Sequence, residues 1–183
     1  RVAIVGGTGS FGSACARRLR EAGHEVVIGS RDAARAAAAA TELGVEGAAN
    51  EAAVRRCDIV LLAASAEAAV ETARALREPI GSTPTLSVAA ELRFAGGGVL
   101  PGSEASSIAE RIQAELDAPV VAGLHSLAAR NLGGEAPPEE DVLLCGDDAA
   151  AKSLALELAG ALTRGRAVDC GPLAGARALE GLT

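Results

Sequence analysis

The sequence VAIVGGTGSFG at residues 2–12 decides the fold. Its glycines fit two spacings, because Gly7, Gly9 and Gly12 make GxGxxG, whereas Gly6 in place of Gly7 makes GxxGxxG. Different nucleotide-binding families use the two spacings. The stretch therefore raises two questions: which spacing is in use, and for which nucleotide.

The glycines stand between a predicted strand and a predicted helix. The β-branched run Val2–Val5 is typical of a strand buried on both faces, and apolar residues at helical spacing follow from Ser10 to Ala22. The start of such a helix presents free backbone N–H groups and the positive end of the helix dipole, which together bind a pyrophosphate. Glycine is needed because a side chain would block the turn, the phosphate or the packing of the helix. We predict dinucleotide binding; the alternative is a tight turn without a ligand.

Strands and helices alternate along the rest of the chain. Further strands are expected at 25–28, 58–63, 85–88, 120–124, 142–145 and 166–169. Further helices are expected at 33–43, 50–56, 67–77, 104–116 and 149–162, with a last one starting near 173. This alternation predicts an α/β fold with a doubly wound, mainly parallel Rossmann-type sheet and helices on both faces. The Gly- or Pro-rich stretches 89–102 and 131–141 are expected to be irregular loops that frame the ligand crevice.

The end of the second strand indicates which nucleotide binds. An acidic residue about twenty positions after the glycines would hold the ribose hydroxyls of NAD, but the sequence there is Gly29, Ser30 and Arg31. Arg35 is expected one helical turn beyond Arg31 on the same side, or else as a solvated charge. A hydroxyl and two guanidinium groups suit the 2′-phosphate of NADP, so we predict NADP rather than NAD.

Length and composition exclude several classes of function. The 183 residues fit a single domain, and the net charge of −7 without any basic run argues against a nucleic-acid partner. Apolar stretches such as 59–64 are too short to cross a membrane, and no signal segment is apparent, so we expect a cytoplasmic protein.

The cysteines do not suggest a metal or redox site. Cys15, Cys57, Cys145 and Cys170 are widely scattered, and only two histidines could complete a metal site. We expect reduced, buried thiols and no metal. No Ser/His/Asp set for nucleophilic catalysis is apparent either.

Several motifs in their order along the chain resemble the NADPH-dependent reductases of coenzyme F420. They are GGTGSFG (6–12), HEVVIGSRD (24–32), CDIVLLAASAE (57–67), GLHSLAA (123–129), LLCGDD (143–148) and DCGPLAGARALEGLT (169–183). The likeness covers nearly the whole chain. It implies that Gly7, Gly9 and Gly12 form the working spacing, with Thr8 at the phosphates.

The resemblance also implies an activity, namely reversible hydride transfer between NADP(H) and the deazaflavin coenzyme F420 as co-substrate. In such chemistry the two cofactors carry the reaction, and the protein orients them and excludes water. No catalytic residue is certain. The implied cofactor-binding residues are Gly7, Thr8, Gly9, Ser10, Phe11, Gly12, Ser30, Arg31, Arg35, Ala64, Ser65, Ser87, Ala89, His125, Ser126 and Leu127.

These residues divide between the two cofactors. The segment from Ala64 would pass beside the nicotinamide, and residues 87–91 and 125–127 would line the deazaflavin pocket. His125 and Ser126 are the candidate deazaflavin-site residues, with a purely structural histidine as the alternative for His125. His24 is expected to be solvated.

The chain departs from the family pattern on the deazaflavin side. Ser65 stands where relatives have proline, Val88 and Glu91 replace two further prolines, and Ala128 replaces another. The family continues beyond Thr183 with a helical segment that helps to build the pocket and a homodimer, so residues 1–183 are expected to form one NADP-binding domain without it. Two alternatives stay open: an NADP(H)-dependent reductase of another acceptor, such as a flavin, an imine or a keto acid, and a non-catalytic NADP(H)-binding or sensing module.

Overall fold

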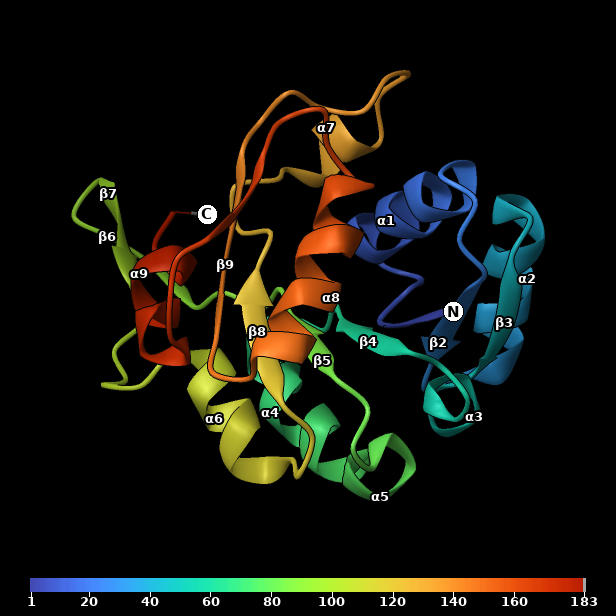
Figure 1. The fold of residues 1–183 in the computed structure, drawn as a ribbon, viewed down its shortest axis with the longest axis horizontal. Helices are drawn as coiled ribbons and strands as arrows, with labels where there is room; N and C mark the ends of the chain where they lie inside the picture. Colours follow the sequence, from blue (N-terminus) through green and yellow to red (C-terminus); the bar gives the residue numbers. More distant parts are fainter. Residues whose placement is uncertain (183) are drawn as a thin grey trace.

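An eight-stranded sheet organises the part of the chain that the computed structural model describes, residues 1–182 (Figure 1). The strand order is β10-β9-β8-β5-β4-β1-β2-β3. Its strands are β1 (Val2–Val5), β2 (Val26–Ser30), β3 (Glu46–Ala49), β4 (Ile59–Leu62), β5 (Thr85–Ser87), β8 (Val120–Gly123), β9 (Val142–Gly146) and β10 (Ala167–Asp169). All neighbouring strands pair in parallel except β8 and β9, which are antiparallel. The predicted mainly parallel sheet is therefore confirmed.

Helices cover both faces of this sheet. They are α1 (Ser10–Glu21), α2 (Ala33–Leu43), α3 (Asn50–Val54), α4 (Ala66–Ala75), α5 (Arg77–Ile80), α6 (Ile108–Glu115), α7 (Ala129–Leu132), α8 (Ala149–Gly160) and α9 (Ala176–Glu180), with a 3₁₀ turn at Leu173–Gly175. One buried cluster joins α1, α2, α7 and α8 to one face, and a second joins α3, α4, α5, α6 and α9 to the other. The two clusters alternate along each strand, as in β1, where Ile4 faces the first and Val5 the second.

The structure contains one sheet strand that the sequence did not predict. Strand β3 has the sequence EGAA, which lacks β-branched residues and so gives no strand signal. It forms because it pairs with β2 at the edge of the sheet, with Val27 opposite Glu46 and Ser30 opposite Ala49. A Cβ on Gly47 would lie 2.5 Å from the Ala36 carbonyl oxygen, so glycine lets α2 pack closely against this strand.

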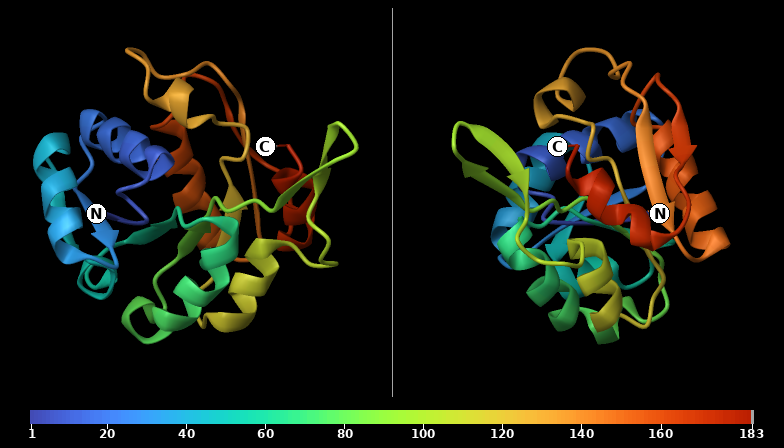
Figure 2. Two further views of the ribbon diagram at one scale, coloured as in Figure 1. Left: turned by 180° about the vertical axis from the view of Figure 1, so that it is seen from behind. Right: turned by 90° about the vertical axis from the view of Figure 1, so that its left-hand side faces the viewer.

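The stretch 89–102, expected to be irregular, contains a two-stranded hairpin of β6 (Leu92–Ala95) and β7 (Gly98–Pro101). Gly96 and Gly97 form its turn with φ of +60° and +83°, the backbone that a tight hairpin turn requires. This Gly-Gly pair was the overlooked sequence signal. Both views of Figure 2 show the hairpin extending away from the sheet.

Other predicted helices have different bounds in the structure. The helix expected at 67–77 is divided into α4 and α5, and the helix expected at 104–116 begins only at Ile108. That later start is set by Ser107, whose hydroxyl accepts from the Glu110 amide at 3.0 Å while the Glu110 carboxylate accepts from the Ser107 amide at 2.8 Å. The last helix begins as the 3₁₀ turn at Leu173 before α9.

The prediction of buried thiols was right for only two of the four cysteines. All four are free; Cys15 and Cys145 are buried, Cys57 is half-buried and Cys170 is exposed. Burial raises the pKa of Cys15 to about 12 and that of Cys145 to about 11. Within residues 1–182 no group of three or more His, Cys, Asp or Glu side chains is arranged for a metal ion, and no helix is long and apolar enough to span a bilayer.

Candidate functional site

The predicted site residues gather at one edge of the sheet. Strands β8, β5, β4, β1 and β2 are parallel, so their carboxyl ends meet at the same edge. The segments there carry Gly7–Gly12 after β1, Ser30 and Arg31 at the end of β2, Ala64 and Ser65 after β4, Ser87 and Ala89 at the end of β5, and His125, Ser126 and Leu127 after β8. Arg35 lies apart from them, on the first turn of α2.

Three glycines of the first turn are required by the fold itself. Gly6 has φ of +81°, and a Cβ there would lie 2.5 Å from the Ala63 carbonyl oxygen. A Cβ on Gly7 would lie 2.5 Å from the Cβ of Ile28, and one on Gly12 would lie 2.5 Å from the Gly6 carbonyl oxygen. Gly6 and Gly7 are therefore both required for packing, and Gly12 lets α1 approach the turn. The sequence-based choice between GxGxxG and GxxGxxG did not allow for a packing role of both Gly6 and Gly7.

Gly9 differs from these three glycines. It is the N-cap of α1 with φ of −81°, and the nearest atom to an added Cβ would be the Gly6 carbonyl oxygen at 3.3 Å. No side chain caps this helix, so the backbone N–H groups of its first turn are available to a ligand. The fold alone does not demand glycine at position 9, whereas a phosphate lying against these N–H groups would.

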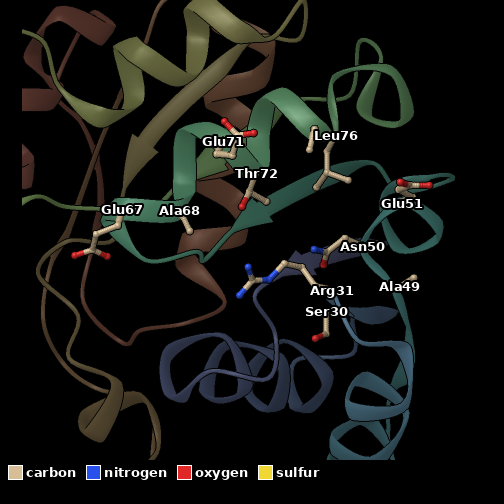
Figure 3. A pocket seen from close by; sticks show the side chains of 11 residues that line it. Ser30, Arg31, Ala49, Asn50, Glu51, Glu67, Ala68, Glu71, Thr72 and Leu76 are labelled. Carbon is tan, nitrogen blue, oxygen red and sulfur yellow. The ribbon is translucent and has the colours of Figure 1, made fainter.

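A cavity of about 500 Å³ opens between the end of β2 and α4 (Figure 3). It is enclosed by the end of β2 and by helices α3 and α4. Its lining residues are Ser30, Arg31, Ala49, Asn50, Glu51, Glu67, Ala68, Glu71, Thr72, Ala75 and Leu76. Only the first two of these were predicted, since no motif marks residues on α3 and α4 that meet only in the folded chain.

Ser30 and Arg31 supply hydrogen-bond donors to this cavity. The Ser30 hydroxyl oxygen accepts from the Asp32 amide at 3.2 Å, which leaves its own proton free to donate. Asp32 caps α2 by accepting from the Ala34 amide at 2.9 Å and the Arg35 amide at 3.2 Å. Arg31 thus precedes the cap and lies outside the helix, so the helical spacing to Arg35 assumed from the sequence was wrong. Arg35 is exposed and does not line the cavity.

Asn50 lies beside Ser30 and Arg31 because Gly29 makes room for it. A Cβ on Gly29 would lie 2.7 Å from the Asn50 Oδ1 and 3.3 Å from the Cβ of Ala53. The Asn50 Oδ1 is buried and has no hydrogen-bond partner within the described chain. Such an unpaired buried oxygen is costly, and Asn50 nevertheless occupies this place beside the cavity.

A second polar group lies at the ends of β5 and β8. His125 is 7% exposed, and its Nε2 lies 3.3 Å from the Ala89 carbonyl oxygen. Burial lowers the pKa of His125 to about 4, although this hydrogen bond raises it. The imidazole is therefore neutral at pH 7, and because a carbonyl only accepts, the proton is on Nε2 and Nδ1 is an acceptor. Within residues 1–182, neither this Nδ1 nor the buried Ser87 Oγ has a partner.

The backbone before His125 is held in an unusual conformation. Leu124 has φ of +67°, in the left-handed region that non-glycine residues rarely adopt, and it is 1% exposed. Its carbonyl accepts from the Leu127 amide at 3.0 Å, which closes a tight turn. The Ser126 hydroxyl donates to the Asp141 carbonyl at 2.8 Å, so this donor already has a structural partner. Leu127 is 5% exposed and packs into the core.

Arg18 on α1 fixes the loop that follows α7. It is 4% exposed, and its Nη2 donates to the Gly134 and Ala136 carbonyls at 2.6 and 2.7 Å. Its Nε donates to the Leu132 carbonyl at 3.0 Å. The helix whose start forms the glycine turn is thereby tied to the segment after the His125 turn.

Glu91, the one unexpected carboxylate of the expected deazaflavin segment, is already paired. Its Oε2 lies 3.0 Å from Nη2 of Arg111 on α6. This ion pair gives Glu91 a structural role at the base of the hairpin β6–β7. The ion pair explains why a charged residue stands there, so Glu91 need not be a catalytic acid or base.

Comparisons with known proteins find relatives along the whole chain. A protein family described as NADP oxidoreductase, coenzyme F420-dependent, matches residues 1–91. The chain is 31% identical to the F420-dependent NADP reductase of Methanothermobacter thermautotrophicus, covering 100% of this chain and 86% of that protein. It is 32% identical to the reductase of the same name from Methanothermobacter marburgensis, covering 100% and 89%.

A solved structure gives the same result for the fold. The crystal structure of an Arthrobacter sp. FB24 protein, assigned provisionally as an F420-dependent NADP reductase, superimposes with a TM-score of 0.82 at 26% identity. The match covers 99% of this chain and 89% of that one. The Rossmann-type fold predicted from the sequence is thus confirmed, and the resemblance of the motifs extends to the whole fold.

Proposed function

The chain belongs to the family of F420-dependent NADP reductases, and we propose that it transfers a hydride between NADP(H) and coenzyme F420. The observation that carries the proposal is the identity of 31–32% over the full chain to reductases of that name. The open glycine turn and the adjoining cavity at the same sheet edge support it, because they suit a phosphorylated dinucleotide.

On the NADP side, the first turn of α1 would receive the pyrophosphate. Residues 7–12 surround these free N–H groups, and Gly9 leaves the approach open. Ser30 and Arg31 would hold the adenosine 2′-phosphate in the 500 Å³ cavity, since a guanidinium offers paired donors to a phosphate. Arg35 would contribute only long-range attraction, because it lies outside the cavity lining.

On the acceptor side, His125 would orient the deazaflavin. Its unprotonated Nδ1 and the Ser87 hydroxyl have no partner in the described chain, so both suit hydrogen bonds to a polar ring. The segments at Ala64–Ser65 and at Ala89 adjoin this region along the sheet edge. The hydride itself moves between the two cofactors; the protein holds their rings in contact and excludes water.

A spectrophotometric assay tests the proposal directly. Purified protein is mixed with NADPH and oxidised F420, and bleaching of the deazaflavin absorbance is followed, with riboflavin and FAD as comparison acceptors. Rapid bleaching selective for F420 is expected. Selective oxidation of NADPH by a flavin, or NADPH binding without any turnover, would overturn the proposed acceptor.

Two finer expectations accompany this function. We expect a homodimer, as the resemblance to the family implies. Light scattering coupled to gel filtration measures it, and a monomer at micromolar concentration would contradict it. We also expect the protein to act in the cytoplasm, where fractionation of cells would locate it.

A further inference from the structure

The cavity at the end of β2 has three hydrogen-bond donors grouped on one side. Ser30, Arg31 and Asn50 lie together at the end of β2 and the start of α3. Glu67 and Glu71 lie on α4 across the cavity (Figure 3). Glu71 is paired with Arg74 at 2.8 Å, so the donors of Ser30, Arg31 and Asn50 are the groups that would hold a dianionic phosphate at their side of the cavity.

Asn50 lies on this side of the cavity with its amide oxygen turned toward Gly29. Its Oδ1 lies against Gly29 and is buried, so Nδ2 is the amide atom left to face the cavity. Figure 3 shows the Asn50 amide beside the Arg31 side chain. An amide nitrogen is a donor only, and it adds to the hydroxyl of Ser30 and the guanidinium of Arg31.

Resting on the proposed function, we propose that Asn50 is a specificity-determining residue that selects NADPH over NADH by donating from Nδ2 to the 2′-phosphate. Gly29 has a matching role, because only glycine leaves room for Asn50 beneath the turn to Arg31. The GSR sequence at 29–31 therefore acts together with a residue twenty positions further along the chain. An aspartate at position 50 would keep the shape but exchange the donor for a carboxylate, which repels a phosphate and accepts from ribose hydroxyls.

The test compares Asn50→Asp and Asn50→Ala with the unaltered protein. NADPH and NADH emission is titrated in the absence of F420, and the chain contains no Trp or Tyr to interfere. We expect Asn50→Asp to lower the NADPH:NADH affinity ratio at least about tenfold and Asn50→Ala to lower it about threefold. Glu51→Gln is the control. It removes a negative charge from the residue that follows Asn50 and so measures the effect of the local electrostatic field alone.

Three outcomes overturn the inference. The first is an NADPH:NADH affinity ratio of Asn50→Asp that lies within about twofold of the ratio of the unaltered protein. The second is that Glu51→Gln raises the NADPH:NADH affinity ratio by as large a factor as Asn50→Asp lowers it, because the local electrostatic field would then explain both changes. The third outcome applies if Asn50→Asp does not fold. It is an NADPH:NADH affinity ratio in folded Asn50→Ala equal to that of the unaltered protein. Unaltered protein that prefers NADPH but does not reduce F420 would contradict the proposed acceptor and leave this inference standing.

Discussion

At the scale of single residues, Arg31 and His125 lie in the two parts of the candidate site. Arg31 is the cationic side chain among the residues that line the cavity, and His125 is a buried neutral base at the other end. Each is placed by its neighbours along the chain: Arg31 precedes the helix cap Asp32, and His125 follows the strained Leu124. Their effects are therefore separable by experiment.

Replacing Arg31 by alanine tests the phosphate assignment. A guanidinium hydrogen-bonded to a phosphate contributes about 1.5–3 kcal/mol, so Arg31→Ala should weaken NADPH binding about 10- to 100-fold and leave NADH binding within about twofold. Titration of nucleotide emission measures both affinities. Arg164→Ala, at an exposed arginine outside the cavity, is the control. An unchanged NADPH:NADH ratio in Arg31→Ala would show that the phosphate binds elsewhere.

His125 makes the stability of the protein depend on pH. Its pKa is about 4 in the folded chain, below the ordinary 6.5 of a histidine, so between these pH values the unfolded chain binds a proton that the folded chain does not. The free energy of unfolding should fall by up to about 3 kcal/mol from pH 7 to pH 4 through this residue. Urea unfolding of the unaltered protein and of His125→Asn, which does not titrate, measures the difference. Equal slopes against pH in the two proteins would contradict the burial argument.

At the scale of elements, the turn between β1 and α1 contains glycines with two different roles, packing of the helix and access for a phosphate. A Cβ on Gly12 meets backbone at 2.5 Å, so Gly12→Ala should cost about 1–3 kcal/mol of stability. A Cβ on Gly9 meets its nearest atom only at 3.3 Å, so Gly9→Ala should fold with a loss below about 1 kcal/mol. Gly9→Ala should nevertheless weaken NADPH binding at least about tenfold, because its methyl group would occupy the approach of the phosphate.

Thermal unfolding and NADPH titration of the two variants separate these duties. Gly9→Ala with full NADPH affinity would mean that the pyrophosphate does not lie against the first turn of α1. Gly12→Ala with unchanged stability would contradict the packing argument.

The connection between α1 and the loop at 132–136 depends on Arg18. Arg18→Met removes the donors to the Leu132, Gly134 and Ala136 carbonyls and should lower the free energy of unfolding by about 2–4 kcal/mol. Arg17→Met is the matched control: Arg17 also donates to Leu132 and Gly134, but its side chain is 34% exposed, so water replaces the lost bonds and the cost should stay below about 1 kcal/mol. Guanidinium unfolding measures both, and equal costs would rule out burial as the cause.

At the scale of the whole molecule, two buried clusters share one sheet. They lie on opposite faces of the same strands, so neither can lose its packing without exposing the other. We therefore expect one cooperative unfolding transition, with equal calorimetric and van't Hoff enthalpies in scanning calorimetry. Two resolved transitions would contradict the prediction that residues 1–183 form one domain, which otherwise stays a prediction.

The sequence by itself determined the class of the fold and predicted the segments that carry the candidate nucleotide site. Buried strands and glycines carry local signals, because β-branched runs, helix caps such as Asp32 and Asp148, and a glycine turn each act over a few neighbouring residues. Seven of the eight strands of the main sheet and the turn after β1 were predicted near their observed places for this reason, and Ser30 and Arg31 were placed at the end of β2.

Only the tertiary structure decided which residues come together at the carboxyl ends of the parallel strands. Strand β3 forms through pairing rather than propensity, Asn50 reaches Arg31 because Gly29 lacks a side chain, and the cavity is completed by α4. These contacts join residues that lie well apart in the chain, such as Val27 and Glu46 in the pairing of β2 with β3, and nothing in the neighbouring sequence signals them. The same holds for the pKa of His125, which is lowered by burial among distant segments that only the folded chain brings together.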